Sequence, residues 1–170
     1  MDRGTMNWDQ LVSDTGPVVW KTLWRLLGER ADVEDCFQET FVAALKLAKR
    51  ELVECWPAML CRLATARGLD RLRQRYRRDR KRLPSESPHP ETPSRDVGPV
   101  DRAIAAELSD RLRKALAQLP ANQAEAFSLH AMLGWSQREI GERLNLTENA
   151  VSVTVHRARQ RLQELLHCSL

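Results

Sequence analysis

The segment SQREIGERLNLTENAVSVTVHRARQRL, residues 136–162, contains the start and stop signals of two helices joined by a tight turn. Ser136 and Glu139 are spaced as a capping box, in which each side chain accepts a hydrogen bond from the other residue's backbone amide. Asn145 tolerates the left-handed conformation of a turn, and Thr147 is a good cap for the next helix. Because the second helix is the longer and more basic one, the segment predicts a helix-turn-helix.

The second helix of this motif has two faces of different chemistry. Its predicted buried stripe consists of Val151, Val155, Ala158 and Leu162. The opposite face carries Asn149, Val153, His156, Arg157 and Gln160. An asparagine can pair with an adenine edge, a valine can contact a thymine methyl group, and the arginines Arg157, Arg159 and Arg161 suit DNA phosphates. A four-helix bundle with a polar outer face is the alternative that these residues leave open.

Two further helices are predicted in front of this motif. The segment LSDRLRKALAQLP, residues 108–120, predicts an amphipathic helix that ends at Pro120. Its apolar side chains are Leu108, Leu112, Ala115, Leu116 and Leu119. The segment ANQAEAFSLHAML, residues 121–133, predicts a short helix that Gly134 ends. Its side chains available for burial are Ala124, Phe127, Leu129 and Leu133.

A proline-rich segment separates these helices from the N-terminal half. Five prolines lie among residues 84 to 99, with several Ser, Thr and Glu residues and no apolar periodicity. Such a segment supports neither a helix nor a buried face, so it predicts a flexible linker over residues 84–100. The predicted domains are therefore residues 1–83 and 101–170. Since no long stretch alternates as a strand does, the predicted fold class is all-α, with two small helical domains.

The segment ERADVEDCFQETFVAALKLAKR, residues 29–50, predicts a helix with an unusual outer face. Asp32 is a suitable cap for it. The predicted core residues are Phe37, Phe41, Ala44, Leu45 and Ala48. The other face carries Asp35, Gln38, Glu39 and Val42, so an apolar valine lies among acidic and polar residues. These residues alone are also compatible with a solvated face that includes one stray valine.

A strongly basic helix is predicted next, in ECWPAMLCRLATARGLDRLRQRYRRDRKRL, residues 54–83. Pro57 suits a first helical turn, and Trp56 can pack at its start. Residues 62–82 carry ten Lys or Arg against two acidic residues. Because so many like charges repel one another unless an anion neutralises them, the run favours nucleic-acid contact over a merely solvated helix end.

Composition bounds the remaining possibilities. The chain has 170 residues, 42% of them apolar and 29% charged, and a net charge of +4. Its four cysteines form no CxxC pair, so no metal site and no cofactor are expected. The sequence has no HExxH, no GxSxG and no phosphate-binding glycine loop, which argues against an enzyme. With no secretory leader pattern and no apolar run of membrane-spanning length, we expect a cytoplasmic protein without membrane insertion.

Three segments together resemble the sigma-70 family of bacterial RNA polymerase sigma factors, specifically the extracytoplasmic-function class. DVEDCFQETFVAALK (32–46) resembles the part of region 2 that docks on the polymerase clamp helices. WPAMLCRLATARGLDRLRQR (56–75) resembles the part that melts and reads the minus-ten element. LPANQAEAFSLHAMLGWSQREIGERLNLTENAVSVTVHRARQRLQELL (119–166) resembles region 4, which reads the minus-thirty-five element. The three segments occur in the family's order and at its separation, and they cover most of the chain.

The resemblance implies partners and site residues. The implied partners are promoter DNA and core RNA polymerase, which is contacted through its clamp helices and flap. The resemblance also allows an anti-sigma factor as a partner. The implied polymerase contacts are Asp35, Gln38, Glu39 and Val42. The region 2 DNA contacts are Trp56, Arg62, Arg67, Arg71, Arg73, Arg75, Tyr76, Arg77 and Arg78. The region 4 DNA contacts are Ser136, Gln137, Thr147, Asn149, Ser152, Val153, Thr154, His156, Arg157, Arg159 and Arg161.

The sequence also departs from the family pattern. Met59, Cys61 and Ala66 stand where the family often has an aromatic pair and an asparagine in the minus-ten segment. Ser152, Val153 and Thr154 stand where the family frequently has Lys or Arg, Ser, and Arg. The second departure implies weaker phosphate anchoring or a different base preference.

Two other classes of function remain as alternatives. A stand-alone helix-turn-helix regulator would act without core polymerase, but it gives no role to the stripe of Asp35, Gln38 and Glu39. An enzyme is the weaker alternative, because no carboxylates are paired in an apolar setting that would tune them. Co-purification with core polymerase distinguishes the sigma factor from both.

Overall fold

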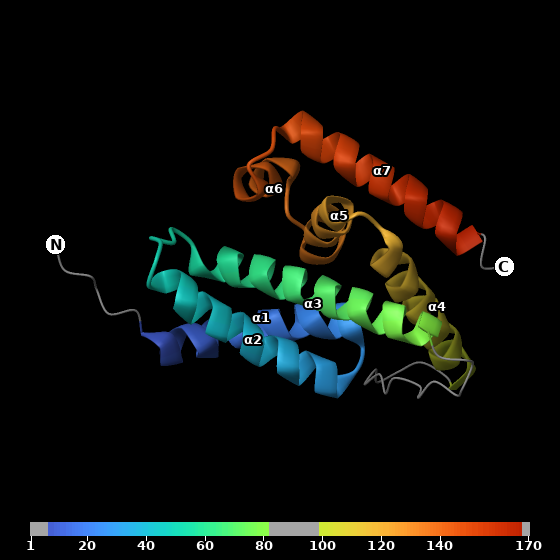
Figure 1. Ribbon diagram of the computed structural model, residues 1–170, viewed down its shortest axis with the longest axis horizontal. Helices are drawn as coiled ribbons and strands as arrows, with labels where there is room; N and C mark the ends of the chain where they lie inside the picture. The colour runs from blue at the N-terminus through green and yellow to red at the C-terminus, as the bar shows by residue number, and fades with distance from the viewer. Residues whose placement is uncertain (1–6, 82–98, 168–170) are drawn as a thin grey trace.

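The computed structural model describes residues 7–81 and 99–167, which form seven helices and confirm the predicted all-α class (Figure 1). The N-terminal half comprises α1 (Trp8–Leu27), α2 (Arg30–Ala48) and α3 (Trp56–Lys81). The C-terminal half comprises α4 (Pro99–Gln118), α5 (Ala121–Leu133), α6 (Gln137–Leu144) and α7 (Glu148–His167). Helix α4 begins inside the predicted linker of residues 84–100, and residues 82–98 lie outside the described part of the chain.

Helix α1 has no counterpart in the sequence analysis. The Asn7 side chain caps it by accepting a hydrogen bond from the Gln10 amide at 3.1 Å. Its buried apolar stripe comprises Val19, Leu23, Leu26 and Leu27. The spacing of this stripe was available in the sequence, but Pro17 inside the helix interrupts the usual signal for a continuous helix.

Helix α2 differs from the prediction in its first residue and in part of its buried face. It starts at Arg30, with Glu29 as the N-cap residue, so the predicted cap at Asp32 is wrong. Asp32 is buried instead and forms ion pairs with α3. The buried residues of α2 are Asp32, Val33, Cys36, Thr40, Phe41 and Ala44. Leu45 and Ala48, predicted in the core, are exposed because the buried stripe follows Val33 and Cys36 rather than the second half of the predicted set.

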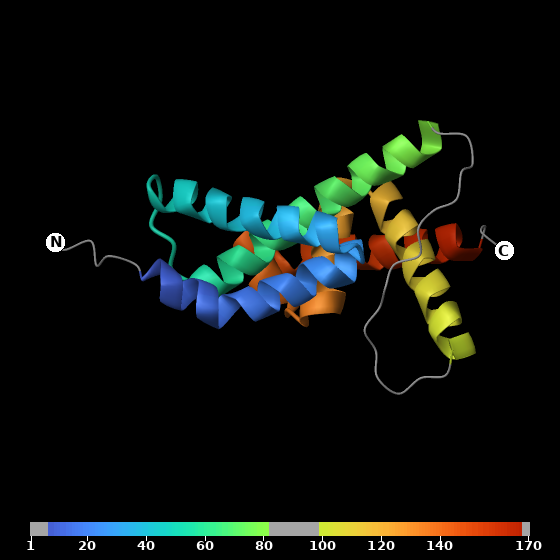
Figure 2. The same ribbon diagram turned by 90° about the horizontal axis from the view of Figure 1, so that it is seen from below.

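Helix α3, the last helix of the N-terminal half, packs against the C-terminal half. Trp56, its first residue, is buried against Trp8 of α1, edge to face, with ring centroids 5.3 Å apart. In Figure 2, α1, α2 and the first part of α3 lie side by side, and the basic end of α3 continues beyond them toward α4. Helices α4 and α5 both contact α3. One continuous core therefore contains residues of both halves, such as Leu60 of α3 and Leu116 of α4.

The predicted helix-turn-helix is confirmed. The capping box of Ser136 and Glu139 is complete, and its hydrogen bonds lower the pKa of the Glu139 carboxyl. Asn145 has a φ of 54°, and the Thr147 hydroxyl accepts a hydrogen bond from the Ala150 amide at 3.2 Å. The predicted buried stripe of α7 is buried throughout. In α4, by contrast, Leu108 is exposed and not part of the core, because the buried part of this helix is confined to its C-terminal end.

Two polar contacts join the halves, and one buried arginine lies between them. Arg25 of α1 donates to the Met132 carbonyl of α5 at 2.7 Å, and Arg62 of α3 pairs with Glu125 of α5 at 3.3 Å. Arg113 of α4 is 6% exposed, and its Nε is buried without a hydrogen-bond partner. Its guanidinium lies over Gly28, where any Cβ atom would overlap it.

The tight turn between α6 and α7 depends on Gly141. A Cβ atom there would lie 2.6 Å from the Leu146 carbonyl oxygen, which belongs to the backbone and cannot move away cheaply. Gly141→Ala should therefore lower the free energy of unfolding by about 1–3 kcal/mol in chemical denaturation. Gly16→Ala is the matched control. Its Cβ would meet Phe37 at 3.6 Å, an ordinary contact, so this variant should gain stability of up to about 1 kcal/mol. Equal stability changes for the two variants would contradict this account.

Arg113 opposes the packing of the two halves on each other. Burial, and then the positive charge of Arg75, lower its pKa from the usual value. Arg113→Met keeps much of the side-chain length and removes the buried charge, so the free energy of unfolding should rise by about 1–2 kcal/mol. Arg111→Met is the control and should lose stability, because Arg111 donates to the Leu166 carbonyl at 2.8 Å. A destabilised Arg113→Met would show that the guanidinium stabilises this interface.

Candidate functional site

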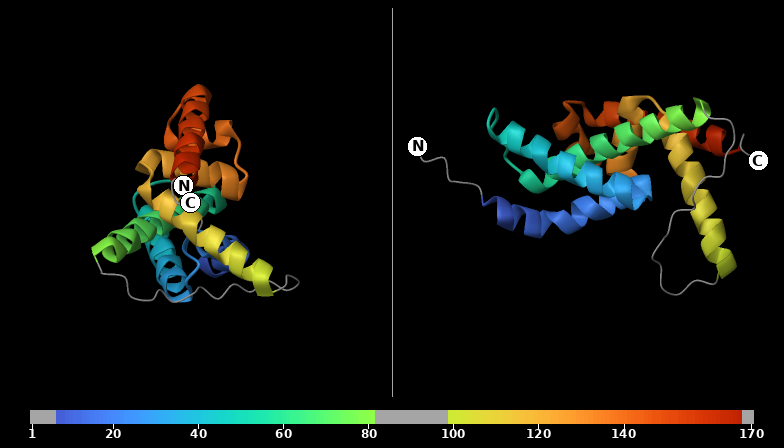
Figure 3. Two further views of the ribbon diagram at one scale, coloured as in Figure 1. Left: turned by 90° about the vertical axis from the view of Figure 1, so that its right-hand side faces the viewer. Right: turned by 60° about the horizontal axis from the view of Figure 1, so that its bottom comes forward.

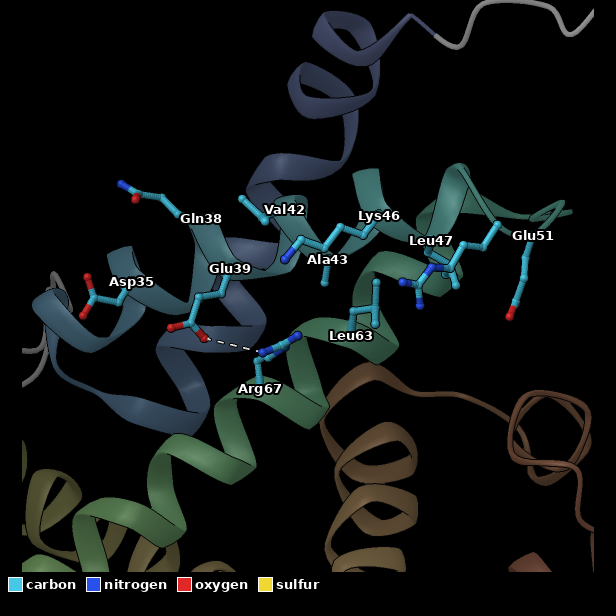
Figure 4. Close-up of a pocket in the computed structure, with 11 residues that line it drawn as sticks. Asp35, Gln38, Glu39, Val42, Ala43, Lys46, Leu47, Glu51, Leu63 and Arg67 are labelled. Atoms are coloured by element: carbon cyan, nitrogen blue, oxygen red, sulfur yellow. Dashed lines mark ion pairs between the residues drawn. The ribbon is translucent and has the colours of Figure 1, made fainter.

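The exposed face of α2 forms one wall of a groove. Asp35, Gln38, Glu39 and Val42 are all exposed, as their predicted role requires, and Val42 is 48% exposed. The groove has a volume of about 740 Å³ and lies between α2 and α3 (Figure 4). Its other lining residues are Ala43, Lys46, Leu47, Arg50, Glu51, Leu63 and Arg67. The sequence analysis assigned Arg67 to DNA and missed the other six, because periodicity within one helix does not reveal which residues of a second helix lie beside it.

The groove has an acidic end, an apolar middle and a second end that is not of one charge. Asp35 and Glu39 lie at the acidic end, Val42 and Leu63 lie in the middle, and Glu51 lies at the other end. Lys46 and Arg50 also line the groove. The acidic end is partly neutralised from within the chain. Such a surface can bind a helical partner through apolar contact, with charged groups fixing its direction.

The acidic end of the groove is tied to α3 by Arg71. Its guanidinium pairs with Asp32 at 3.1 Å, Asp35 at 3.5 Å and Glu39 at 3.3 Å. Arg67 approaches Glu39 from the same helix at 3.9 Å, as Figure 4 shows. Behind this face, burial raises the pKa of the Cys36 thiol to about 11, so the cysteine is a neutral core residue.

The predicted region 2 DNA contacts divide into four groups. Trp56 is buried in the core. Five arginines are held in ion pairs: Arg62 with Glu125, Arg67 with Glu39, Arg71 with three carboxylates, Arg73 with Asp70, and Arg75 with Glu29 and Asp32. Arg77 and Arg78 are exposed and form no ion pair with the residues that the structure describes. Tyr76 is half-buried, with the Arg80 guanidinium 5.9 Å from its ring centroid.

One side of α3 faces the other half of the molecule. Arg62 pairs with Glu125 of α5, and Met59 and Ala66 lie one turn on either side of it on the same helical face. Met59 and Ala66 are half-buried, and Cys61 is buried. Two of the three residues that depart from the family pattern in the minus-ten segment therefore lie on the side of α3 that α5 approaches.

The outer face of α7 is open. Asn149, Val153, His156 and Arg157 are exposed, and Val153 is 41% exposed. Arg159 and Arg161 are exposed as well, the latter paired with Glu164 at 2.7 Å. Figure 3 shows α7 at the opposite end of the molecule from α1 and α2. The helix therefore presents an unobstructed surface of the size and charge that suits a DNA major groove.

Three predicted region 4 contacts have other structural roles, and two more are half-buried. The hydroxyl groups of Ser136 and Thr147 cap α6 and α7. Thr154 donates to the Ala150 carbonyl at 2.7 Å and so bonds to its own helix. Ser152 is half-buried, as is Gln137 at the start of α6. Asn149 and Val153 are left as the exposed, uncharged side chains suited to reading bases.

The described residues offer neither a cluster of metal ligands nor a membrane-spanning helix. Within residues 7–81 and 99–167, no group of three His, Cys, Asp or Glu side chains could hold a metal ion. None of the helices in these ranges is both long enough and apolar enough to cross a membrane.

Comparison with known proteins connects both halves to one family. Residues 11–78 match the family description "Sigma-70 region 2", and residues 109–162 match "Sigma-70, region 4". The ECF RNA polymerase sigma factor SigE of Mycolicibacterium smegmatis is 31% identical over 160 residues, which is 94% of this chain and 62% of SigE. The chain thus spans less than two thirds of that relative's length. ShbA of Streptomyces griseus, also an ECF RNA polymerase sigma factor, is 33% identical over 83% of this chain and 75% of its own length.

Solved structures show a similar fold. CnrH, solved in complex with the cytosolic domain of CnrY, aligns with a TM-score of 0.58 and 25% identity, covering 96% of this chain and 89% of CnrH. The sigma factor RpoE of Bartonella quintana, solved with the anti-sigma factor NepR, aligns with a TM-score of 0.57 and 24% identity, covering 95% and 97%.

Proposed function

The chain belongs to the extracytoplasmic-function sigma factors of the sigma-70 family. On that premise we propose that one of its surfaces binds core RNA polymerase and that others bind promoter DNA. Proteins of this family are not enzymes; they direct transcription initiation with RNA polymerase. The groove between α2 and α3 binds the clamp helices of core RNA polymerase. The outer face of α7 reads the minus-thirty-five element, and α3 contacts the minus-ten element.

The groove is the observation that carries this proposal. A single exposed valine is common on a solvated helix, but Val42 lines a groove together with Leu47 and Leu63, which suits an interface with an apolar centre and a charged rim. Val42 lies in the middle of the groove, next to its acidic end. A partner helix with a basic group near Asp35 and Glu39 would complement the acidic end. We assign Gln38 to the same interface because it extends the exposed stripe of α2.

The proposed domains follow the family matches. Region 2 occupies residues 1–83, a linker residues 84–100, and region 4 residues 101–170. The matched segments, 11–78 and 109–162, fall within the two proposed regions. Because Arg62 is paired with Glu125, contact of this side of α3 with DNA requires α5 to move off it.

For DNA binding we assign different weights to the arginines of α3. Arg77 and Arg78 are exposed, and the described structure gives them no ion pair, so they are available to phosphates at once. Arg62, Arg67, Arg71, Arg73 and Arg75 must first exchange a carboxylate for a phosphate. The arginines of α7, Arg157, Arg159 and Arg161, anchor region 4 to the DNA backbone.

An anti-sigma factor is a proposed further partner. The structure of CnrH was solved in complex with the cytosolic domain of CnrY, and that chain aligns over 96% of this one. We also propose that the protein works in the cytoplasm, because core polymerase and promoter DNA are its proposed partners.

The first test concerns the groove. Val42→Asp places a charge in the apolar centre of the proposed interface, so affinity for core polymerase should fall about ten-fold or more in a binding titration. Val18→Asp is the matched control, because Val18 is 49% exposed on α1, outside the groove. Unchanged core affinity in a folded Val42→Asp protein would contradict docking at this groove and favour a regulator that acts without polymerase.

The second test concerns base reading by α7. Minus-thirty-five sequences selected by the holoenzyme should change at one position in Val153→Ala and at another in Asn149→Ala. A lost thymine methyl contact costs about 1 kcal/mol, and a lost pair of hydrogen bonds to adenine about 1–3 kcal/mol. Gln163→Ala, an exposed position farther along α7, is the control. Identical base preferences in all proteins would assign site selection to phosphate placement and groove shape instead.

A further inference from the structure

Residues proposed for two different partners contact each other in the free chain. Each carboxylate oxygen of Glu39 approaches a different arginine of α3: Oε1 lies 3.3 Å from Arg71 Nη2, and Oε2 lies 3.9 Å from Arg67 Nη1. Glu39 is assigned to polymerase and the two arginines to DNA. The free protein therefore uses groups from one proposed interface to neutralise groups from the other.

The two arginines differ in how firmly they are held. Arg71 also pairs with Asp32, whose side chain is only 13% exposed, and with Asp35. The Arg71 side chain is itself 21% exposed, so it stays in place when one carboxylate is taken away. The Arg67 side chain is 45% exposed, and Glu39 is its sole ion-pair partner within the described residues. Because such exposed pairs are weak, a cation from a partner can replace Arg67 at little cost.

We propose that Glu39 is an exchange point that couples polymerase docking to DNA binding. The inference rests on the proposed docking of polymerase on the α2 face. A basic group of the polymerase takes the Glu39 carboxylate, and the released Arg67 guanidinium becomes available to a DNA phosphate. By linkage, DNA that occupies Arg67 strengthens polymerase binding by the same factor, because it frees one carboxylate oxygen of Glu39 while Arg71 keeps the other.

The geometry gives the exchange its direction. Glu39 and Arg67 lie on facing walls of the groove, so a partner seated there meets the carboxylate directly (Figure 4). Arg71 remains bound to Asp32 and keeps α2 and α3 together while the exchange takes place. The free chain thus has one fewer available phosphate-binding charge than the polymerase-bound chain.

The test uses the isolated full-length chain and a fluorescein-labelled DNA duplex of mixed sequence. Glu39→Gln should bind this duplex roughly two- to five-fold more tightly, which is the effect of freeing one arginine from an exposed ion pair. The salt dependence should steepen by about one released counterion. Glu54→Gln is the control for charge alone, since Glu54 is exposed and forms no ion pair with the described residues.

A double-mutant cycle then assigns the effect to Arg67. In an Arg67→Gln background, Glu39→Gln should improve DNA binding no more than Glu54→Gln does. Arg67→Gln alone should raise the affinity for core polymerase by roughly two- to five-fold, because it removes one of the two arginines that pair with Glu39. Circular dichroism and thermal melting check that each variant is folded.

The outcomes separate this inference from the proposed function. If Glu39→Gln and Glu54→Gln change DNA binding equally, or if the gain persists without Arg67, the exchange is wrong even where Val42→Asp abolishes polymerase binding. If Val42→Asp leaves polymerase binding intact, the docking surface is wrong, and the exchange with polymerase is wrong with it. A gain from Glu39→Gln that depends on Arg67 in the isolated chain, together with tighter polymerase binding by Arg67→Gln, supports the exchange.

Discussion

The structure depends on the burial of α3 on more than one side. Leu60, Ala64, Leu69 and Leu72 are buried in the core that α3 shares with α1 and α2, and the same helix also contacts α4 and α5. Each fully buried leucine contributes about 2 kcal/mol, so this helix supplies a large part of the core. Since α3 also carries most of the basic charge, its packing determines which arginines are exposed.

The packing of α3 also decides which of its arginines pair with carboxylates of neighbouring helices. Exposed ion pairs contribute little to stability, and the pair of Arg67 with Glu39, whose side chains are 45% and 47% exposed, is of this kind. Their effect is on availability, because an arginine that already has a carboxylate partner must give it up before it binds a phosphate. Asp32 differs, because its burial between Arg71 and Arg75 makes it part of the packing of α2 on α3. The buried Arg113, whose Nε has no hydrogen-bond partner among the described residues, has the opposite effect and weakens the interface between the halves.

Region 4 relies on local structure to a greater extent. Its turn is fixed by a capping box, a left-handed asparagine and a glycine that allows backbone contact, all within a few residues. These devices fix the direction of α7 relative to α6. The outer face of α7 can therefore remain open while α5, on its other side, packs against region 2.

The sequence alone determined the features that depend on residues close to one another in the chain. The capping box at Ser136, the turn at Asn145 and the buried stripe of α7 were predicted correctly, because each depends on residues within one or two turns of helix. The exposed stripe of α2, from Asp35 to Val42, was predicted for the same reason. The family resemblance added the order of the two regions, and the comparisons confirmed it.

Only the tertiary structure decided the rest. Asp32 looked like a cap, but two arginines from another helix hold it in the core. Leu45, Ala48 and Leu108 were predicted to be buried and are exposed, because neighbouring helices, not periodicity, fix which part of an apolar stripe is covered. Whether an arginine of α3 meets solvent, a carboxylate of α2 or Glu125 of α5 depends on contacts between residues far apart in the chain, and no local pattern of residues records those contacts.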